Sequence, residues 1–278
     1  MNALHICGLS KKYPQFSLEN FDLELPAGCI MGLVGENGAG KSTVIKSVVG
    51  LIHPDSGEIR VFDRQVCPES MEDIGVVLDG GCMPEKISGN ELGRLLKKCY
   101  HSWDSQRYAA LLHQLDVDAD KRFCELSRGM KMKISLAAAM SHHARLLILD
   151  EATSGLDVIA RDIVLDLLLD YISDGECSVL LSSHIVSDLE KVCDYVCFIH
   201  GGRRLLLEEK DELLEKYCML HCTRSELEKL PVEHVIGRRV NNFGAEVLVE
   251  RRNVPAGMTA ERAGLEDIML FFVKGERQ

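Results

Sequence analysis

A glycine-rich stretch that ends in lysine and serine is the first part of the chain whose residue types could do chemistry. The sequence GENGAGKS occupies residues 35–42 and fits the pattern G-x-x-x-x-G-K-[ST]. Glycines let backbone N–H groups approach phosphate oxygens closely, and the N-terminus of a following helix adds partial positive charge. The phosphate-contacting residues are predicted to be Gly35, Asn37, Gly38, Ala39, Gly40, Lys41, Ser42 and Thr43.

Two side chains of this stretch have more specific predicted roles. Lys41 can reach the outer phosphates, and the Ser42 hydroxyl can be a ligand of Mg²⁺. The alternative is a plain glycine turn that Lys and Ser follow by chance. A predicted strand before the stretch and a predicted helix after it favour the phosphate site.

Two adjacent carboxylates end the apolar run RLLILDE at residues 145–151. A buried strand would deliver them to its carboxyl end, where ligands bind in parallel sheets. Asp150 can then contribute to the Mg²⁺ shell, and Glu151 can accept a proton from a water that attacks the terminal phosphate. Taken alone, two acidic residues at a strand end could also cap the next loop.

A histidine follows another apolar run, CSVLLSSH, at residues 177–184. His184 can hydrogen-bond a terminal phosphate and help to position the water. A lone histidine is more often structural, so this prediction depends on the two preceding motifs.

The elements that must position these residues alternate along the chain. Strands are expected at 21–25, 29–34, 74–78, 145–151, 177–184 and 194–200, and a turn followed by a strand at 53–61. Helical periodicity appears at 41–51, at several places between 88 and 142, and at 156–172, where Ile159, Ile163, Leu167 and Leu168 form one stripe. Strands that alternate with helices predict an α/β core with a mostly parallel sheet, into which 85–142 is inserted.

Composition restricts the classes of function. Of the 278 residues, 46% are hydrophobic and 27% are charged, as in an ordinary globular protein, and the formal net charge is -11. A uniformly basic surface for nucleic acid is therefore not expected. No apolar run of membrane-spanning length and no signal peptide is recognised, which predicts a cytosolic chain. The pairs Cys193/Cys197 and Cys218/Cys222 are interpreted as core residues rather than metal ligands.

Taken together, these motifs resemble those of the ATP-binding-cassette (ABC) ATPases over residues 3–210. GENGAGKS resembles the family's phosphate loop, LLILDE its Mg²⁺ and general-base strand, SGLD (154–157) its partner-facing loop, and His184 its switch histidine. The resemblance implies a P-loop NTPase cassette with a mostly parallel core sheet, an antiparallel β subdomain and an inserted helical subdomain. Residues 1–210 would be the ATPase domain, and 211–278 a small α/β extension.

The resemblance also implies ATP and Mg²⁺ as cofactors and a second cassette as a partner. Two cassettes of this family pack head to tail, as a homodimer or a heterodimer, and each ATP lies between one chain's phosphate loop and the other's signature loop. LSRGMK (126–131) occupies the place of the signature, so that Ser127 and Gly129 would face phosphate, while Asp157 belongs to the partner-facing loop. Tyr13, with Phe16 as the alternative, would stack on adenine.

Three residues depart from the family pattern. Arg128 replaces a glycine of the signature, and either reaches the partner's ATP or pairs with Glu125. Met130 stands where glutamine is usual. Asp79 takes the position of a glutamine that senses Mg²⁺ and contacts the membrane subunit, so Asp79 is expected to tune hydrolysis rather than to enable it.

The work that the ATP does also follows only from the resemblance. It implies the ATP-hydrolysing subunit of an exporter, bound to the inner face of the cell membrane, with an integral-membrane permease docked near residues 79–105 and no nucleic acid as partner. The group includes exporters linked to antimicrobial peptide resistance. A soluble, non-transport ABC ATPase and a non-hydrolysing ATP-binding regulator remain the alternatives.

Overall fold

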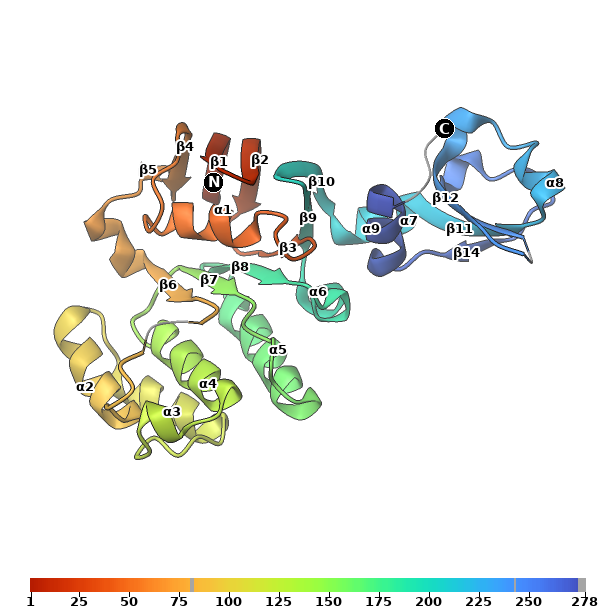
Figure 1. Ribbon diagram of the computed structural model, residues 1–278. Helices are drawn as coiled ribbons and strands as arrows, with labels where there is room; N and C mark the ends of the chain where they lie inside the picture. Colours follow the sequence, from red (N-terminus) through yellow and green to blue (C-terminus); the bar gives the residue numbers. More distant parts are fainter. Residues whose placement is uncertain (81–82, 243, 275–278) are drawn as a thin grey trace. The chain divides into compact units, whose positions relative to one another are not determined.

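The computed structural model describes residues 1–80, 83–242 and 244–274, and Figure 1 shows their helices and strands. The chain divides into two units, Met1–Arg204 and Leu205–Gln278. The motifs that carry chemistry all lie in the first unit. The sequence-based boundary at residue 210 and the role of the C-terminal extension stay predictions.

Continuous apolar runs form the sheet at the centre of the first unit. Its strands are β3 (Ile30–Val34), β6 (Ile74–Val77), β7 (Leu146–Asp150), β8 (Ser178–Ser183), β9 (Tyr195–His200) and β10 (Arg203–Glu209), in the order β10-β9-β3-β8-β7-β6. β10 begins in the first unit and continues past its boundary at Arg204. Every residue of β3, β7 and β8 is buried, because both faces of a parallel sheet are covered. The predicted mostly parallel core sheet is confirmed.

The register of this sheet brings four chain segments to one edge. Val34 of β3 pairs with Ser183, Asp150 of β7 pairs with Ser182, and Val77 of β6 pairs with Leu149. All these pairs are parallel, so the segments that follow the strands emerge at the same, carboxyl edge. The sheet therefore brings the phosphate-loop sequence, Asp79, Glu151 and His184 to neighbouring positions.

A second sheet of the first unit is antiparallel. It contains β1 (Asn2–Tyr13), β2 (Phe16–Pro26), β4 (Ser56–Val61) and β5 (Arg64–Gln65), in the order β2-β1-β4-β5, and a 3₁₀ helix at Pro68–Asp73 follows. The sequence did not predict β1, because irregular pairing between Ile6 and Leu9, with Gly8 at φ 60°, interrupts the alternation. The sheet is the antiparallel β subdomain that the family resemblance implied.

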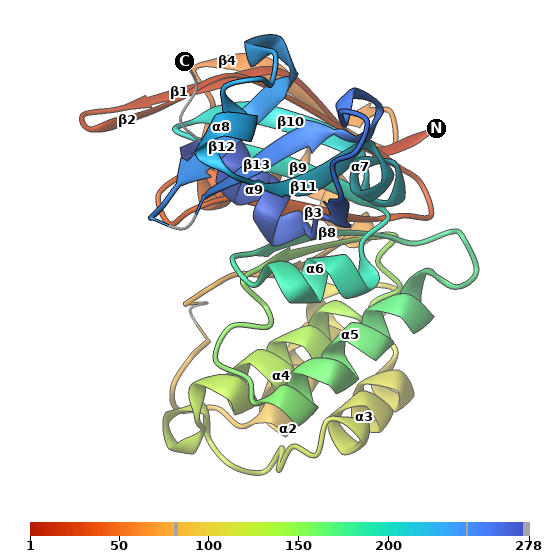
Figure 2. The ribbon, with the colours of Figure 1, turned by 90° about the vertical axis from the view of Figure 1, so that its right-hand side faces the viewer.

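Three helices are inserted between β6 and β7, as predicted. They are α2 (Gly89–Cys99), α3 (Ser105–Gln114) and α4 (Arg128–Ala139), with a 3₁₀ turn at Phe123–Glu125 before α4. Ser88, Asp104 and Ser127 cap their N-termini through side-chain oxygens. Figure 2 shows these helices together on one side of the parallel sheet, beside α5.

The remaining helices of the first unit are α1 (Lys41–Val48), α5 (Val158–Ile172) and α6 (Val186–Val192). The predicted stripe of α5 is partly wrong, because Ile159 is 74% exposed. The buried side of α5 instead carries Ala160, Val164, Leu165, Leu167, Leu168 and Tyr171. Val158, at 78% exposed, begins the helix beside Ile159, so two apolar side chains face away from the core there.

The second unit is a small α/β unit. Its strands β11 (Tyr217–Cys222), β12 (Val235–Val240), β13 (Ala245–Glu250) and β14 (Ala260–Arg262) form an antiparallel sheet in the order β12-β13-β11-β14. The helices are α7 (Lys210–Lys216), α8 (Arg224–Leu227) and α9 (Leu265–Lys274), with 3₁₀ turns at Val232–His234 and Arg251–Asn253. Its core includes Leu220, Val247 and Val249. Residues 243 and 275–278 of the predicted extension lie outside the described residues.

Both cysteine pairs lie in the interior, as core packing requires. Cys193, Cys197, Cys218 and Cys222 are all buried, and burial raises the pKa of Cys197 to about 12. In the parts of the chain that the structure describes, no cluster of three or more His, Cys, Asp or Glu side chains could hold a metal ion. No helix of those parts is long and apolar enough to cross a membrane.

Candidate functional site

The loop between β3 and α1 takes a backbone course that favours glycine at several positions. Gly38 has φ 81° and Gly40, the N-cap of α1, has φ 118°, in the region that L side chains rarely adopt. At Gly35 the reason is space, because an added Cβ would lie 2.3 Å from the carbonyl oxygen of Ile199. The glycines therefore permit a tight loop in which no side chains cover the backbone at these positions, directly before the helix α1.

Lys41 is held inside this loop, with 5% of its surface exposed. Its Nζ donates to the carbonyl oxygen of Gly35 at 2.7 Å and to that of Glu36 at 3.3 Å. The same Nζ lies 3.5 Å from Oε1 of Glu151, which connects the loop after β3 to the end of β7. The ammonium group is thus placed at the carboxyl edge of the sheet.

Ser182 organises the two carboxylates at the end of β7. Its hydroxyl donates to Oδ1 of Asp150 at 2.6 Å and accepts from the backbone N–H of Glu151 at 3.1 Å. Glu151 has φ 54°, so the chain turns sharply as it leaves the strand. The sequence analysis missed Ser182; its one signal was a serine pair just before His184 at the end of β8.

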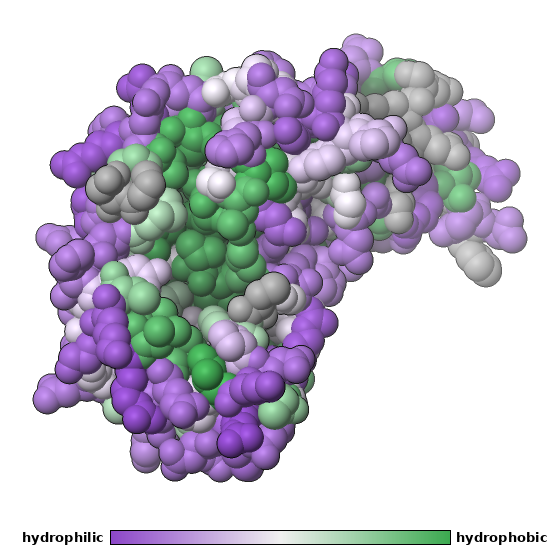
Figure 3. Space-filling view, turned by 60° about the vertical axis from the view of Figure 1, so that its left-hand side comes forward, coloured by the Kyte–Doolittle hydropathy of each residue, from purple (hydrophilic) through white to green (hydrophobic). Residues whose placement is uncertain are grey.

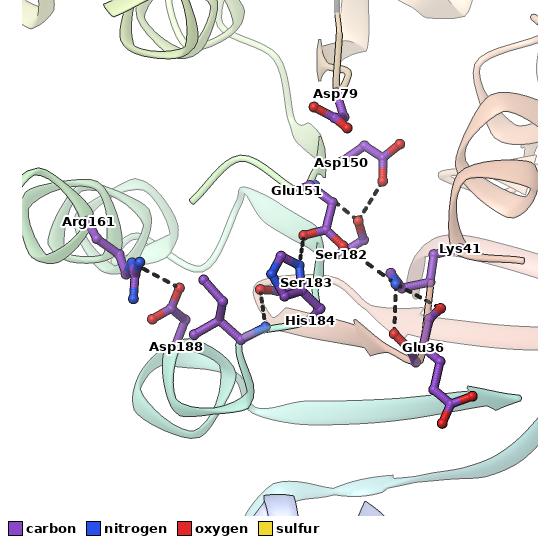
Figure 4. A network of polar contacts seen from close by, with 12 residues as sticks. Glu36, Lys41, Asp79, Asp150, Glu151, Arg161, Ser182, Ser183, His184 and Asp188 are labelled. Carbon is purple, nitrogen blue, oxygen red and sulfur yellow. Dashed lines mark hydrogen bonds and ion pairs between the residues drawn. The ribbon is translucent and has the colours of Figure 1, made fainter. Parts of the chain in front are cut away.

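His184 and Glu151 are in direct contact. The distance between Nδ1 of His184 and Oε2 of Glu151 is 2.6 Å, and the imidazole is about half exposed. Figure 4 shows Asp79, Asp150, Glu151, Ser182 and His184 close together, with Lys41 beside them. The predicted catalytic residues Lys41, Glu151 and His184 are therefore brought together by three different strand ends.

A cavity of about 380 Å³ opens beside Lys41, Asp79 and Glu151, and its described lining does not include Asp150 or His184. Its walls come from the β1–β2 turn, the loop after β3, the end of β6 and the end of β7, and its lining comprises Tyr13, Phe16, Glu36, Asn37, Gly38, Gly40, Lys41, Ser42, Thr43, Asp79 and Glu151. Both aromatic candidates line the cavity, with ring centroids 6.3 Å apart. The lining of the cavity thus combines two aromatic rings at the β1–β2 turn with the backbone and the Lys41 ammonium group of the loop after β3.

The signature residues lie elsewhere. Ser127, Gly129 and Asp157 do not belong to the described residues that line this cavity. Ser127 caps α4, and Oδ1 of Asp157 caps α5 by accepting from the N–H of Ala160 at 2.9 Å, which holds the pKa of Asp157 below its usual value. An added Cβ at Gly129 would lie 3.3 Å from the carbonyl oxygen of Gly155, so the signature turn packs closely on the SGLD loop.

Arg128 and Asp79, two of the three departures from the family pattern, form an ion pair with each other. The distance between Nη2 of Arg128 and Oδ1 of Asp79 is 2.5 Å. Glu125, one of the two partners considered for Arg128, is not the partner observed; its Oε2 accepts from the backbone N–H of Arg122 at 2.9 Å. The carboxylate at position 79 is therefore compensated within the same chain.

A parallel sheet whose strand leads into a G-x-x-x-x-G-K-S loop and a helix, with carboxylates on a neighbouring strand end, defines a P-loop nucleoside triphosphatase. Comparisons with known proteins agree and go further. The family model described as ABC transporter matches residues 18–154. The ABC transporter ATP-binding protein YtrB of Bacillus subtilis is 30% identical over 203 residues, which cover 72% of this chain and 69% of that protein.

Two more similarities support the same family. The lantibiotic transport ATP-binding protein SrtF of Streptococcus pyogenes is 31% identical, over 75% of this chain and 91% of that protein. A solved structure of an ATP-binding subunit of an ABC transporter superposes with a TM-score of 0.69 at 26% identity, over 76% of this chain and 91% of the other. The chain belongs to the ABC transporter family, and it is an ATP-binding ATPase of that family.

Proposed function

We propose that the cavity between the β1–β2 turn and the carboxyl edge of the sheet holds ATP. The single observation that carries this proposal is the convergence of Lys41, Glu151 and the bare glycine backbone on one cavity. The loop N–H groups from Gly38 to Thr43 cradle the phosphates, and Lys41 neutralises the outer ones. Tyr13 stacks on the adenine, with Phe16 beside it.

Mg²⁺ fits the oxygen donors next to this cavity. The Ser42 hydroxyl lines the cavity, and the buried Asp150 carboxylate stands one residue from Glu151. Hydroxyl and carboxylate oxygens are the donors that Mg²⁺ prefers, and the ion supplies charge neutralisation of the phosphate oxygens when it is bound. The hydrogen bond from Ser182 fixes the orientation of the Asp150 carboxylate.

Glu151 is the proposed general base, and His184 is the proposed orienting residue. A water near the terminal phosphate would give its proton to Glu151, whose Oε2 is hydrogen-bonded to His184. Oε1 of Glu151 is near Lys41, and phosphate oxygens would compete with the carboxylate for this ammonium group. Nucleotide binding would then free Glu151 to act on water.

A second cassette is the proposed partner for the signature residues. If Ser127 and Gly129 contact phosphate, the nucleotide must be bound to another chain, because neither residue lines the described cavity of their own chain, and Asp157 does not line it either. Val158 and Ile159 are 78% and 74% exposed directly after Asp157. A contact between two cassettes at this loop would bury both of these apolar side chains.

Export through a separate integral-membrane permease is the proposed work of the ATP, with the chain on the cytoplasmic face of the membrane. The relative SrtF carries the name of a lantibiotic transport protein, which supports this proposal. A groove whose lining includes Leu78, Met83, Pro84 and Met132 lies partly in the segment 79–105 that the resemblance assigned to permease docking and partly on α4. Residues 81–82 of that segment lie outside the described residues. Figure 3 shows hydrophobic residues gathered in a hollow on one face.

Isolation from membranes tests the coupling to a permease. The tagged chain should be recovered from detergent-solubilised membranes with a polytopic protein in constant ratio. Met83→Glu should lose this protein, because it places a charge in the groove, while ATP binding is retained. Arg60→Glu, exposed on β4 and outside the segment 79–105, is the control. Recovery of the same protein by both variants would exclude the groove as the docking site.

A further inference from the structure

We propose that Arg128 is a positioning residue for nucleotide binding, which acts by neutralising Asp79 at the mouth of the ATP cavity of its own chain. The inference rests on the proposed function of that cavity. This role differs from a direct contact of Arg128 with a nucleotide bound to a partner chain, because the effect of Arg128 on binding then requires the Asp79 carboxylate.

The charges that line the cavity make such compensation necessary. Its described lining includes three carboxylates, from Glu36, Asp79 and Glu151, and a single cation, from Lys41. Lys41 already lies 3.5 Å from Glu151. The proposed ligand carries several negative charges, so an uncompensated Asp79 would weaken its binding.

Asp79 lines two spaces at once. It belongs to the lining of the nucleotide cavity and to that of the groove at α4, and Arg128 lines the groove but not the cavity. The Arg128 guanidinium therefore meets the Asp79 carboxylate from the groove side, at 2.5 Å. In this position the guanidinium neutralises the negative charge of Asp79 at the cavity mouth and does not itself line the cavity.

The backbone near Arg128 holds its side chain in this orientation. Ser127 caps α4 directly before it, and the Cδ of Arg128 lies within 3.5 Å of the point where a Cβ on Gly155 would be. The aliphatic part of the side chain thus rests against the SGLD loop, and only the guanidinium extends to Asp79. With side chains 60% and 44% exposed, the pair is expected to contribute little to overall stability.

A double-mutant cycle on nucleotide affinity tests the proposal. Fluorescent-ATP binding is measured for wild type, Arg128→Gln, Asp79→Asn and the double variant, at protein concentrations where light scattering finds only monomer. Arg128→Gln should weaken binding by about two- to fivefold, the range that an exposed ion pair supports. The double variant should bind as wild type does, because no charge remains to compensate. Arg128→Lys should retain most of the affinity.

Two further measurements separate charge from structure. Raising the ionic strength from low salt to 0.5 M should shrink the difference between Arg128→Gln and wild type, since the Debye length falls to about 4 Å. Arg60→Gln removes a comparable exposed ion pair, with Glu58 at 2.8 Å on β4, and should leave affinity unchanged.

The outcomes are distinct. The proposal would be overturned if Arg128→Gln weakened ATP binding equally in the wild-type and in the Asp79→Asn background. It would also be overturned if Arg128→Gln left the ATP affinity of the monomer unchanged. An effect on turnover of the dimer alone would instead assign Arg128 to the partner's nucleotide. Failure of the wild-type protein to bind ATP would refute the proposed cavity itself, before the ion pair is tested.

Discussion

Glu151 bridges Lys41 and His184: its Oε1 lies 3.5 Å from Nζ of Lys41, and its Oε2 lies 2.6 Å from Nδ1 of His184. The two partners come from segments that are 143 residues apart in the chain, since 184 − 41 = 143. One carboxylate therefore links the phosphate-loop lysine to the end of β8. In the proposed mechanism, nucleotide binding withdraws Lys41 from this bridge and leaves Glu151 oriented by His184.

Replacement of the bridging carboxylate should separate binding from turnover. Glu151→Gln is nearly isosteric, so it should bind ATP with at most a few-fold change in affinity and favour the cassette dimer. Its turnover should fall by about 10²- to 10⁴-fold, the usual contribution of a general base. Phosphate release and equilibrium binding measure the two effects. Turnover close to that of wild type would refute the role of Glu151, and Glu58→Gln, on the exposed side of β4, is the control.

Ser182 should matter for turnover although it does not belong to the described lining of the cavity. Ser182→Ala removes the donor to Asp150 and one acceptor of the Glu151 N–H, both in a region where water cannot replace them. We expect the free energy of unfolding to fall by about 1–3 kcal/mol, together with a higher Mg²⁺ requirement for turnover. Ser173→Ala removes an exposed hydroxyl and should change little. An unchanged Mg²⁺ requirement would show that Asp150 does not need this partner.

His142 should make the stability of the first unit depend on pH. Burial lowers the pKa of His142 below its ordinary value of 6.5, while its Nε2 bonds the carbonyl oxygen of Ile74 at 3.2 Å and its ring stacks on Tyr100. The folded state thus favours the neutral imidazole. Its stabilising contribution is full above pH 6.5 and is lost as the pH falls from there through the folded-state pKa.

Chemical unfolding of His142→Gln at two pH values tests this dependence. The variant should lose about 1–3 kcal/mol relative to wild type at pH 8, and clearly less at pH 5. His143→Gln changes a half-exposed neighbour and serves as the control. An equal loss at both pH values would show that the titration of His142 does not contribute.

Much of the fold was predictable because apolar runs of strand length and helical periodicity alternate in the first unit. The run RLLILDE predicted β7 and the position of Glu151 at its end, and the parallel order of the sheet follows from such alternation. The strand β1 was missed because its irregular pairing breaks the two-residue period. The exposed position of Ile159 was missed because helical spacing does not say where a helix emerges from the core.

The site was predictable where a local motif specifies the residue type at each position, as in the phosphate loop. It was not predictable where two segments meet only through the fold. The Arg128–Asp79 pair joins residues 49 positions apart, and no local pattern connects them. The serine pair before His184 does not reveal the role of Ser182 either, because only the register of β7 with β8 places Ser182 opposite Asp150.

The proposed function depends above all on ATP being held by the loop from Gly35 to Thr43, with Lys41 at its outer phosphates. The most direct test is equilibrium binding of MgATP to Lys41→Ala, with Lys46→Ala in the same helix as control and thermal unfolding to verify that both variants fold. Lys41→Ala should lose MgATP binding and turnover, while Lys46→Ala should keep both. A folded Lys41→Ala protein that binds and hydrolyses MgATP as the wild type does would contradict the proposed function.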